Sequence, residues 1–414
     1  MKLNSILDIF KKSKPKNLDT TVNTVYKKDI PESPITNAIL EAGMKKALSK
    51  DFQGALKDFN IVIEIEPLSV DAANAYLERV KIKLELKDVA TIDEDMDAAK
   101  VILDRMDEAW DAYTVGGEDY DNGNYKSAIK NYNNAISLRP TLTDVYYNRG
   151  IAKQLLKDFK GAIEDFDKTI ETNASNIIDA YVERGHIKYH ELKDKEGAIQ
   201  DYNKAIEINP NDANLFYRRA SLLDEFDAIQ DLNKAIELNP SVAKNYWARG
   251  IRKHKNKDYE GGQKDILKYI NLAPSDAVVS IAEAYSLMGS MKIGMNDFKG
   301  ALQDLNKAIK LDSLHIETLL DRGITKSFLK DYEGAIVDFN KVLELEPTEA
   351  DAYYNRGLTK NSLGRKEEGN IDIAKAKKLG YDVPNDDYDE EEAKAFAEAH
   401  FKKIVEEVKE KKKL

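Results

Sequence analysis

A phrase of about 34 residues recurs along most of this 414-residue chain. It is clearest from Thr143 to Ser175 and again from Ala350 to Gly380. Its core is Y-x-x-R-G, followed by G-A-I-x-D-F-x-K-A-I-E-x-x-P, which predicts a helix, a short turn, a second helix and a stop. Because each such unit buries its apolar face only against its neighbours, this period favours one elongated domain over two or three globular ones.

Ten units can be counted from about Thr36 to Tyr381. Val80 and Ala220 stand at the glycine position of two units. The other eight have a glycine there, in the first helix: Gly43, Gly116, Gly150, Gly185, Gly250, Gly289, Gly323 and Gly357. A glycine inside a helix costs roughly 1 kcal/mol relative to alanine. Its regular use therefore predicts that the paired helix approaches closely at this point.

The second helices have an alanine followed four residues later by a large side chain, a spacing that lays both on one helical face. We expect these residues to form the core: Ala55 and Phe59, Ala128 and Tyr132, Ala162 and Phe166, Ala198 and Tyr202, Ala228 and Leu232, Ala301 and Leu305, Ala335 and Phe339. Prolines follow six second helices and end them: Pro67, Pro140, Pro210, Pro240, Pro274 and Pro347.

Three units depart from the pattern. The second replaces its turn with KDVATIDEDM, the sixth is short, and the eighth has about five additional residues between Pro274 and Tyr285. We expect each departure to bend or loosen the stack locally. The alternative is that one of them is a docking point.

Seven units place an arginine just before the glycine position and an aspartate just before the large residue of the second helix. We expect these to pair, within a unit or with the next one: Arg79, Arg149, Arg184, Arg219, Arg249, Arg322 and Arg356 with Asp95, Asp165, Asp201, Asp231, Asp265, Asp338 and Asp372. A partly buried pair of this kind fixes register more than it adds stability. The alternative is a row of arginines that binds phosphate or carboxylate ligands.

The order of Tyr or Trp, Gly, Ala, Phe or Tyr, and Pro in these units resembles the tetratricopeptide repeat family. The resemblance implies an all-α, right-handed superhelical solenoid whose first helices line a concave, peptide-binding groove. Carried over to this chain, the groove face comprises Tyr147 with Ile151, Tyr217 with Ser221, Trp247 with Ile251, Leu320 with Ile324, and Tyr354 with Leu358. The alternative is that these side chains pack against adjacent first helices.

Some relatives grip a terminal carboxylate with Lys, Asn and Arg on three successive first helices. With Asn148 as the middle member, the preceding helix offers Tyr113 and Gly117, and the following one offers Asp179 and Glu183. The clamp is therefore not assembled here, and we do not expect recognition of chaperone tails by this mode.

Composition and motifs give little support to other functions. A net charge of -11 disfavours nucleic acid partners, so RNA binding by helical repeats is a weak alternative. There is no cysteine, P-loop, nucleophile elbow or HExxH motif, and only His186 and His190 share a helical face. We therefore expect no enzyme activity, metal or cofactor. The runner-up is a regulatory or catalytic protein with a site on the helical stack.

The two ends differ from the repeats between residues 36 and 381. Residues 1–35 comprise a basic amphipathic segment and a linker, and weak peripheral membrane contact through residues 1–16 is the alternative to local packing. Residues 382–414 form a predicted capping helix with an acidic first turn and an apolar face of Phe396, His400, Phe401, Ile404, Val405 and Val408.

We thus expect a noncatalytic scaffold or adaptor that binds other proteins or peptides. The amino-terminal residues lack a small-residue cleavage site, and no run approaches the roughly 18 apolar residues of a membrane span. Together with the lack of cysteine, this predicts a cytoplasmic protein.

Overall fold

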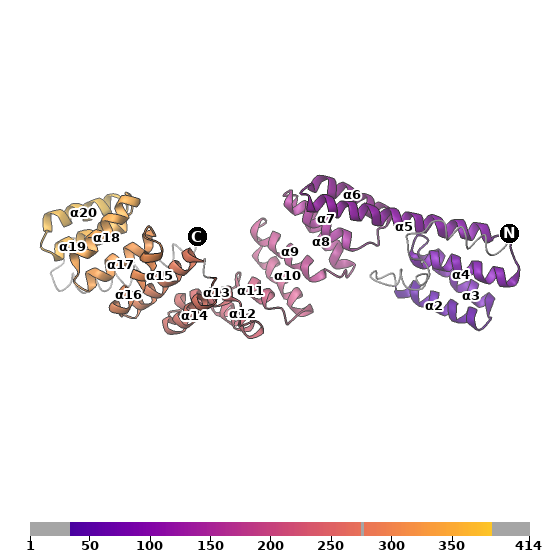
Figure 1. Cartoon of the computed structure of the whole chain (residues 1–414), viewed down its shortest axis with the longest axis horizontal. Coiled ribbons are helices and arrows are strands. Elements are labelled where there is room, and N and C mark those ends of the chain that lie inside the picture. Colours follow the sequence, from indigo (N-terminus) through magenta and orange to yellow (C-terminus); the bar gives the residue numbers. More distant parts are fainter. Residues whose placement is uncertain (1–33, 275–276, 383–414) are drawn as a thin grey trace. The chain divides into compact units, whose positions relative to one another are not determined.

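The computed structural model describes residues 34–274 and 277–382, and every regular element in these ranges is an α-helix (Figure 1). The expected all-α helical repeat fold is confirmed. The amino-terminal segment and the predicted capping helix lie outside the described residues.

The chain divides into two compact units, with the boundary after Ile208. The first contains α2 (Pro34–Leu48), α3 (Phe52–Ile65), α4 (Val70–Leu86), α5 (Ile92–Asp121), α6 (Tyr125–Leu138), α7 (Asp144–Leu155), α8 (Phe159–Glu171), α9 (Ile177–His190) and α10 (Lys195–Ile208). The second contains α11 (Ala213–Ala220), α12 (Glu225–Leu238), α13 (Ala243–Lys255), α14 (Tyr259–Leu272), α15 (Val278–Gly294), α16 (Phe298–Leu311), α17 (Ile316–Phe328), α18 (Tyr332–Leu345), α19 (Ala350–Ser362) and α20 (Lys366–Lys378).

In most repeats, the short turn between the two helices contains a lysine followed by an aspartate. In the fourth repeat, Lys157 adopts a left-handed conformation with φ 63°, which ends α7. Asp158 then caps α8, because its carboxylate accepts a hydrogen bond from the Gly161 backbone N–H at 3.1 Å. The same capping bond begins α3, α14, α16 and α18.

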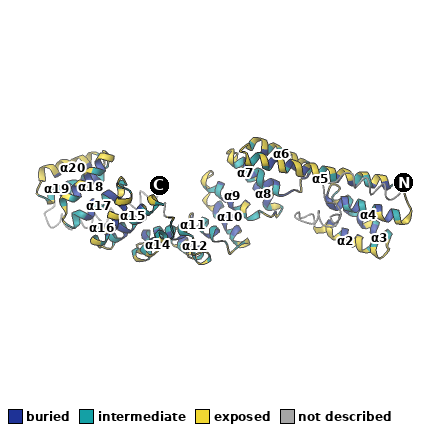
Figure 2. Ribbon diagram, in the orientation of Figure 1, coloured by how far each residue is buried: buried dark blue, intermediate teal, exposed yellow. Residues whose placement is uncertain are grey.

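The repeat glycines lie where the two helices of a repeat touch. A Cβ atom on Gly116 would lie 2.6 Å from a ring carbon of Tyr132, and one on Gly323 would lie 2.6 Å from a ring carbon of Phe339. Both rings are buried, as are the other alanines and large residues predicted for the second helices. Figure 2 shows buried positions in dark blue along the helices of both units. The predicted close approach and the predicted core are confirmed.

The irregular repeats change helix lengths. α5 is a continuous helix of 30 residues that is both the second helix of the second repeat and the first helix of the third. The sixth repeat has a first helix of only 8 residues, α11. In the eighth, the additional residues lengthen the first helix, α15, to 17 residues. The expectation that every repeat has two separate helices is wrong at α5, since neither proline nor glycine interrupts it before Gly116.

All seven predicted arginine-aspartate pairs form, each within its own repeat. The Arg149 Nε donates to Asp165 at 2.9 Å, and the guanidinium lies over the Tyr146 ring at 5.5 Å from its centroid. The Asp165 side chain is only 4% exposed. The arginines therefore serve the fold, and a row of arginines open to anionic ligands is not what the structure shows.

Two further partners of this pair were not predicted. A lysine three residues after the glycine position binds the same aspartate; Lys153, for example, lies 2.8 Å from Asp165. In the first and eighth repeats, which lack the arginine, Lys46 and Lys292 still bind Asp58 and Asp304, and Lys307 is a second partner of Asp304. Most of the arginines also reach the preceding second helix, where Asn133, Asp167, Asn233, Asn306 and Asn340 accept from them.

Candidate functional site

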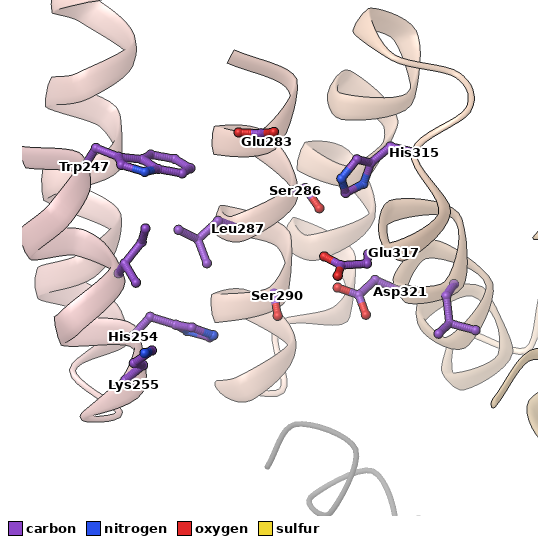
Figure 3. A pocket seen from close by; sticks show the side chains of 12 residues that line it. Trp247, His254, Lys255, Glu283, Ser286, Leu287, Ser290, His315, Glu317 and Asp321 are labelled. Carbon is purple, nitrogen blue, oxygen red and sulfur yellow. The ribbon is translucent and has the colours of Figure 1, made fainter. Parts of the chain in front are cut away.

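A cavity of about 300 Å³ lies on the first helices of the seventh, eighth and ninth repeats, within the second compact unit (Figure 3). These helices are α13, α15 and α17. Side chains of α13 and α17 face each other across α15. The cavity exists because α15 has small residues in the middle position: Ser286 and Ser290 stand where α13 has Trp247 and Ile251 and where α17 has Leu320 and Ile324.

The apolar part of the lining consists of Trp247, Ile251, Leu287 and Leu320. The indole of Trp247 is held in place by Tyr269, whose ring centroid lies 5.0 Å away. Both rings pack on a buried cluster that includes Ile266 and Met291, each 0% exposed. The aromatic wall is therefore pre-formed, which lowers the entropic cost of binding a ligand there.

A buried polar network fixes α17 against α15 beneath the cavity. His315 caps α17, because its Nδ1 accepts the Thr318 backbone N–H at 3.2 Å. The Thr318 hydroxyl lies 2.7 Å from the same Nδ1 and donates to the Ser286 Oγ at 2.8 Å. Thr318 is 1% exposed.

The charged part of the lining is predominantly acidic. Glu283 on α15 and Glu317 and Asp321 on α17 contribute carboxylates, and Figure 3 shows the two α17 side chains directed towards α15. The basic side is Lys255, beside the buried His254 on α13. The Lys255 Nζ lies 3.8 Å from a Glu225 carboxylate oxygen.

The structure separates the predicted groove residues into three groups. Trp247, Ile251 and Leu320 line the cavity. Ile324 and Tyr354 are only 4% and 2% exposed, and Tyr354 stacks on Tyr381 with ring centroids 4.5 Å apart. Their burial matches the packing alternative and disfavours a ligand-facing side chain at these two positions.

The remaining predicted residues are the exposed Ser221 and four that are half-buried, Tyr147, Ile151, Tyr217 and Leu358. Tyr147 packs on Phe166 at 5.8 Å between ring centroids, and the Lys244 ammonium lies 4.4 Å from the centroid of the Tyr217 ring. Burial, and then the nearby Asp179 and Glu183, raise the pKa of Tyr147. None of these five residues lines the cavity.

Sequence reasoning missed the contribution of α15. Ser286, Leu287 and Ser290 are not large groove residues, yet two of them create the space and the third forms an apolar wall. The available signal was the appearance of two serines at positions that are aromatic or aliphatic in the flanking repeats.

Other functional features are sparse among the described residues. Across residues 34–274 and 277–382, no group of three or more histidine, aspartate or glutamate side chains is arranged to hold a metal ion. His186 and His190 lie on one face of α9, with ring centroids 4.4 Å apart. Within the same ranges, no helix combines the length and the apolar character that crossing a bilayer requires.

Comparisons with known proteins agree with the helical repeats. Family models described as TPR repeat match residues 116–157, 187–223 and 329–364, and one described as tetratricopeptide repeat matches residues 282–313. Among curated proteins, Tetratricopeptide repeat protein 36 of Danio rerio is 35% identical over 68 residues, which is 16% of this chain. The match spans about a third of that relative, 36% of its length.

Among solved structures, the C-terminal part of a TPR repeat-containing protein from Cytophaga hutchinsonii has a TM-score of 0.51. It is 18% identical, and the alignment covers 59% of this chain and 98% of that one. YrrB, described as a TPR protein with an unusual peptide-binding site, is 25% identical, with 43% of this chain and 91% of that one covered and a TM-score of 0.37.

Proposed function

Because this chain belongs to the tetratricopeptide repeat family, we propose that it is a noncatalytic scaffold that binds a peptide segment of another protein in the cavity over α13, α15 and α17. The observation that carries the proposal is the aromatic and aliphatic lining contributed by the first helices of three consecutive repeats. A cytoplasmic location is part of the proposal, and cell fractionation tests it.

The size and composition of the cavity favour side chains of a peptide. At about 300 Å³ it is at the lower end of the range of ligand pockets, which are typically lined by apolar and aromatic groups with a few polar ones. Trp247 offers a large, rigid contact area with few rotors to immobilise. A side chain of a partner peptide can therefore be buried between Trp247 and Leu320 while its backbone crosses the helices.

Tryptophan fluorescence gives a direct test, since the chain has only two tryptophans, Trp110 and Trp247. Trp110 is 54% exposed and lies on α5 in the first compact unit. A Trp110→Phe variant therefore leaves Trp247 as the reporter. Peptides selected on the full chain from a random library should change its fluorescence saturably.

Filling the cavity should abolish this signal. Ser290→Leu, in the Trp110→Phe background, places an aliphatic side chain in the space between Ile251 and Leu320. Ser221→Leu is the matched control, because Ser221 has the same position in the sixth repeat, is exposed and lies outside the cavity. Selected peptides that bind Ser290→Leu as well as they bind the control would refute the proposed site.

A further inference from the structure

Resting on the proposed function, we infer that the cavity accepts a basic segment of a partner protein. In this arrangement an arginine or lysine side chain lies beside Trp247 and Leu287 and is bound by the carboxylates of Glu283, Glu317 and Asp321. This chemistry is the reverse of a basic clamp for a terminal carboxylate.

The charge of the cavity lining favours a cation. Three carboxylates face the cavity against one lysine, Lys255, which already has Glu225 as a neighbour at 3.8 Å. A carboxylate accepts hydrogen bonds at several lone-pair positions, so a guanidinium or ammonium can bind beside any partner that the carboxylate already has.

The positions of these acids in their helices also favour a cationic ligand. Acidic residues in the first turn of a helix are favoured by the helix dipole, and Glu317 lies there. Glu283 and Asp321 lie beyond the first turn of α15 and α17, so the dipole does not account for them. Together with Glu317 they line one cavity, and Figure 3 shows Glu317 and Asp321 beside each other and directed towards α15, which points to a cationic ligand.

The cavity combines these carboxylates with the indole of Trp247. The face of a tryptophan ring attracts cations, and arginine in particular, within about 6 Å of its centroid. A basic side chain gains from both the ring and the carboxylates in the same space, whereas an acidic one is repelled. The net charge of -11 acts in the same direction during approach.

The test compares two synthetic peptides on the full chain with Trp110→Phe. In the first, arginine alternates with leucine; in the second, glutamate replaces each arginine. We expect saturable binding of the arginine peptide with a Kd that rises with salt, and no binding of the glutamate peptide. Neutralising two carboxylates in a Glu317→Gln, Asp321→Asn variant should weaken arginine-peptide binding by about tenfold or more.

A matched control separates the local effect from net charge. Glu164→Gln with Glu196→Gln removes the same two charges from exposed positions on α8 and α10, and should leave the Kd nearly unchanged. Equal loss in both variants would overturn the inference, as would equal binding of the two peptides.

Failure of this inference is distinguishable from failure of the proposed function. Library peptides that depend on Ser290 but carry no excess of arginine or lysine would overturn the basic ligand and leave the peptide site standing. Absence of any Ser290-dependent binder would overturn both. Light scattering on the unliganded chain tests a different occupant. If the chain is a dimer and Ser290→Leu makes it a monomer, the cavity is occupied by a second copy of the chain, and the inference of a basic partner is overturned.

Discussion

Arg149 shows how much one side chain does in this fold. It binds Asp165 within its repeat, donates to Asn133 of the preceding helix at 2.6 Å, and covers the ring of Tyr146. The arginine-aspartate pairing was predictable, because the two residues recur at fixed offsets from core positions. The role of Lys153 was not, since lysine and arginine together make up 63 residues and a recurring lysine does not stand out from a solvated surface.

The first prediction concerns this pair. Asp165→Leu should reduce the free energy of unfolding by about 3 to 5 kcal/mol, because it leaves the largely buried charges of Arg149 and Lys153 without their shared partner. Arg149→Met should cost less, because Lys153 still binds Asp165. The double variant should be more stable than Asp165→Leu alone. Urea denaturation measures all three.

The exposed pair Lys234 and Glu237 is the control, and removing either partner should change stability little. A double variant of Arg149 and Asp165 that is no more stable than the worse single one would contradict the pairing as the source of the effect.

The second prediction uses Asp372. Burial alone would raise the pKa of its carboxyl, but hydrogen bonds from Arg356 and Lys360, both at 2.8 Å, hold the folded-state pKa below its ordinary value. The unfolded chain therefore binds the proton first as pH falls. The stabilisation is complete above the unfolded pKa of about 3.9 and is lost as pH falls through the folded one.

Asp372→Asn should accordingly be less stable than the parent near neutral pH, with a gap that narrows between about pH 5 and pH 2. Urea denaturation across this range measures the gap. Glu164→Gln, at an exposed position, should show little gap at any pH. If the difference in stability between the parent and Asp372→Asn stayed constant across this pH range, the lowered pKa of Asp372 would not contribute to the stability of the fold.

At the scale of helices, the distance between paired helices is set by one small residue facing one large one. This was predictable from the recurring glycine and from the alanine and aromatic pair in the second helix. The continuous α5 was not, because the sequence between Ile92 and Gly116 has repeat spacing but no residue that ends a helix. In α5 the relevant signal was the lack of a helix-ending residue, which the repeat spacing does not reveal.

Two neighbouring glycines of α5 give the third prediction. A methyl group on Gly116 would lie 2.6 Å from the Tyr132 ring, whereas one on Gly117 meets nothing within 4 Å. Gly116→Ala should destabilise the protein by about 1 to 3 kcal/mol through overpacking. Gly117→Ala should stabilise it by about 0.5 to 1 kcal/mol, because alanine is the better helix former.

Thermal and urea denaturation of these two variants measure the difference. Tyr132→Leu combined with Gly116→Ala should recover part of the loss, since the smaller side chain makes room for the methyl group. Equal effects of the two alanines would mean that helix propensity, not helix approach, governs the position.

Over the whole molecule, contacts run mainly between neighbouring helices, as expected for a repeat array. This was predictable from the period. The cavity over α13, α15 and α17 was not predictable, because it arises where small side chains replace large ones. Ser286 and Ser290 define it by their small size, and Ile324 and Tyr354 are excluded from it by packing that a repeat pattern does not reveal.

The fourth prediction follows from neighbour-limited contacts. Phe339→Ala, at a position that is 0% exposed, should cost about 3 to 5 kcal/mol. Hydrogen exchange followed by mass spectrometry should show faster exchange in α16 to α20 and little change in α2 to α10. Phe59→Ala, near the other end, should give the opposite distribution. Uniform acceleration in either variant would mean that the whole chain unfolds as one cooperative unit.

The bond from each arginine to the preceding second helix bears on how such a chain grows. The arginine of such a repeat donates to the second helix of the preceding repeat, as Arg322 does to Asn306. The second helix of the same repeat has the asparagine or aspartate that accepts from the arginine of the following repeat, as Asn340 does from Arg356. Tandem duplication of a coding segment for one repeat would thus add a copy that has both the arginine donor and the asparagine or aspartate acceptor of the bond between repeats. The array could lengthen without a compensating substitution at the new junction.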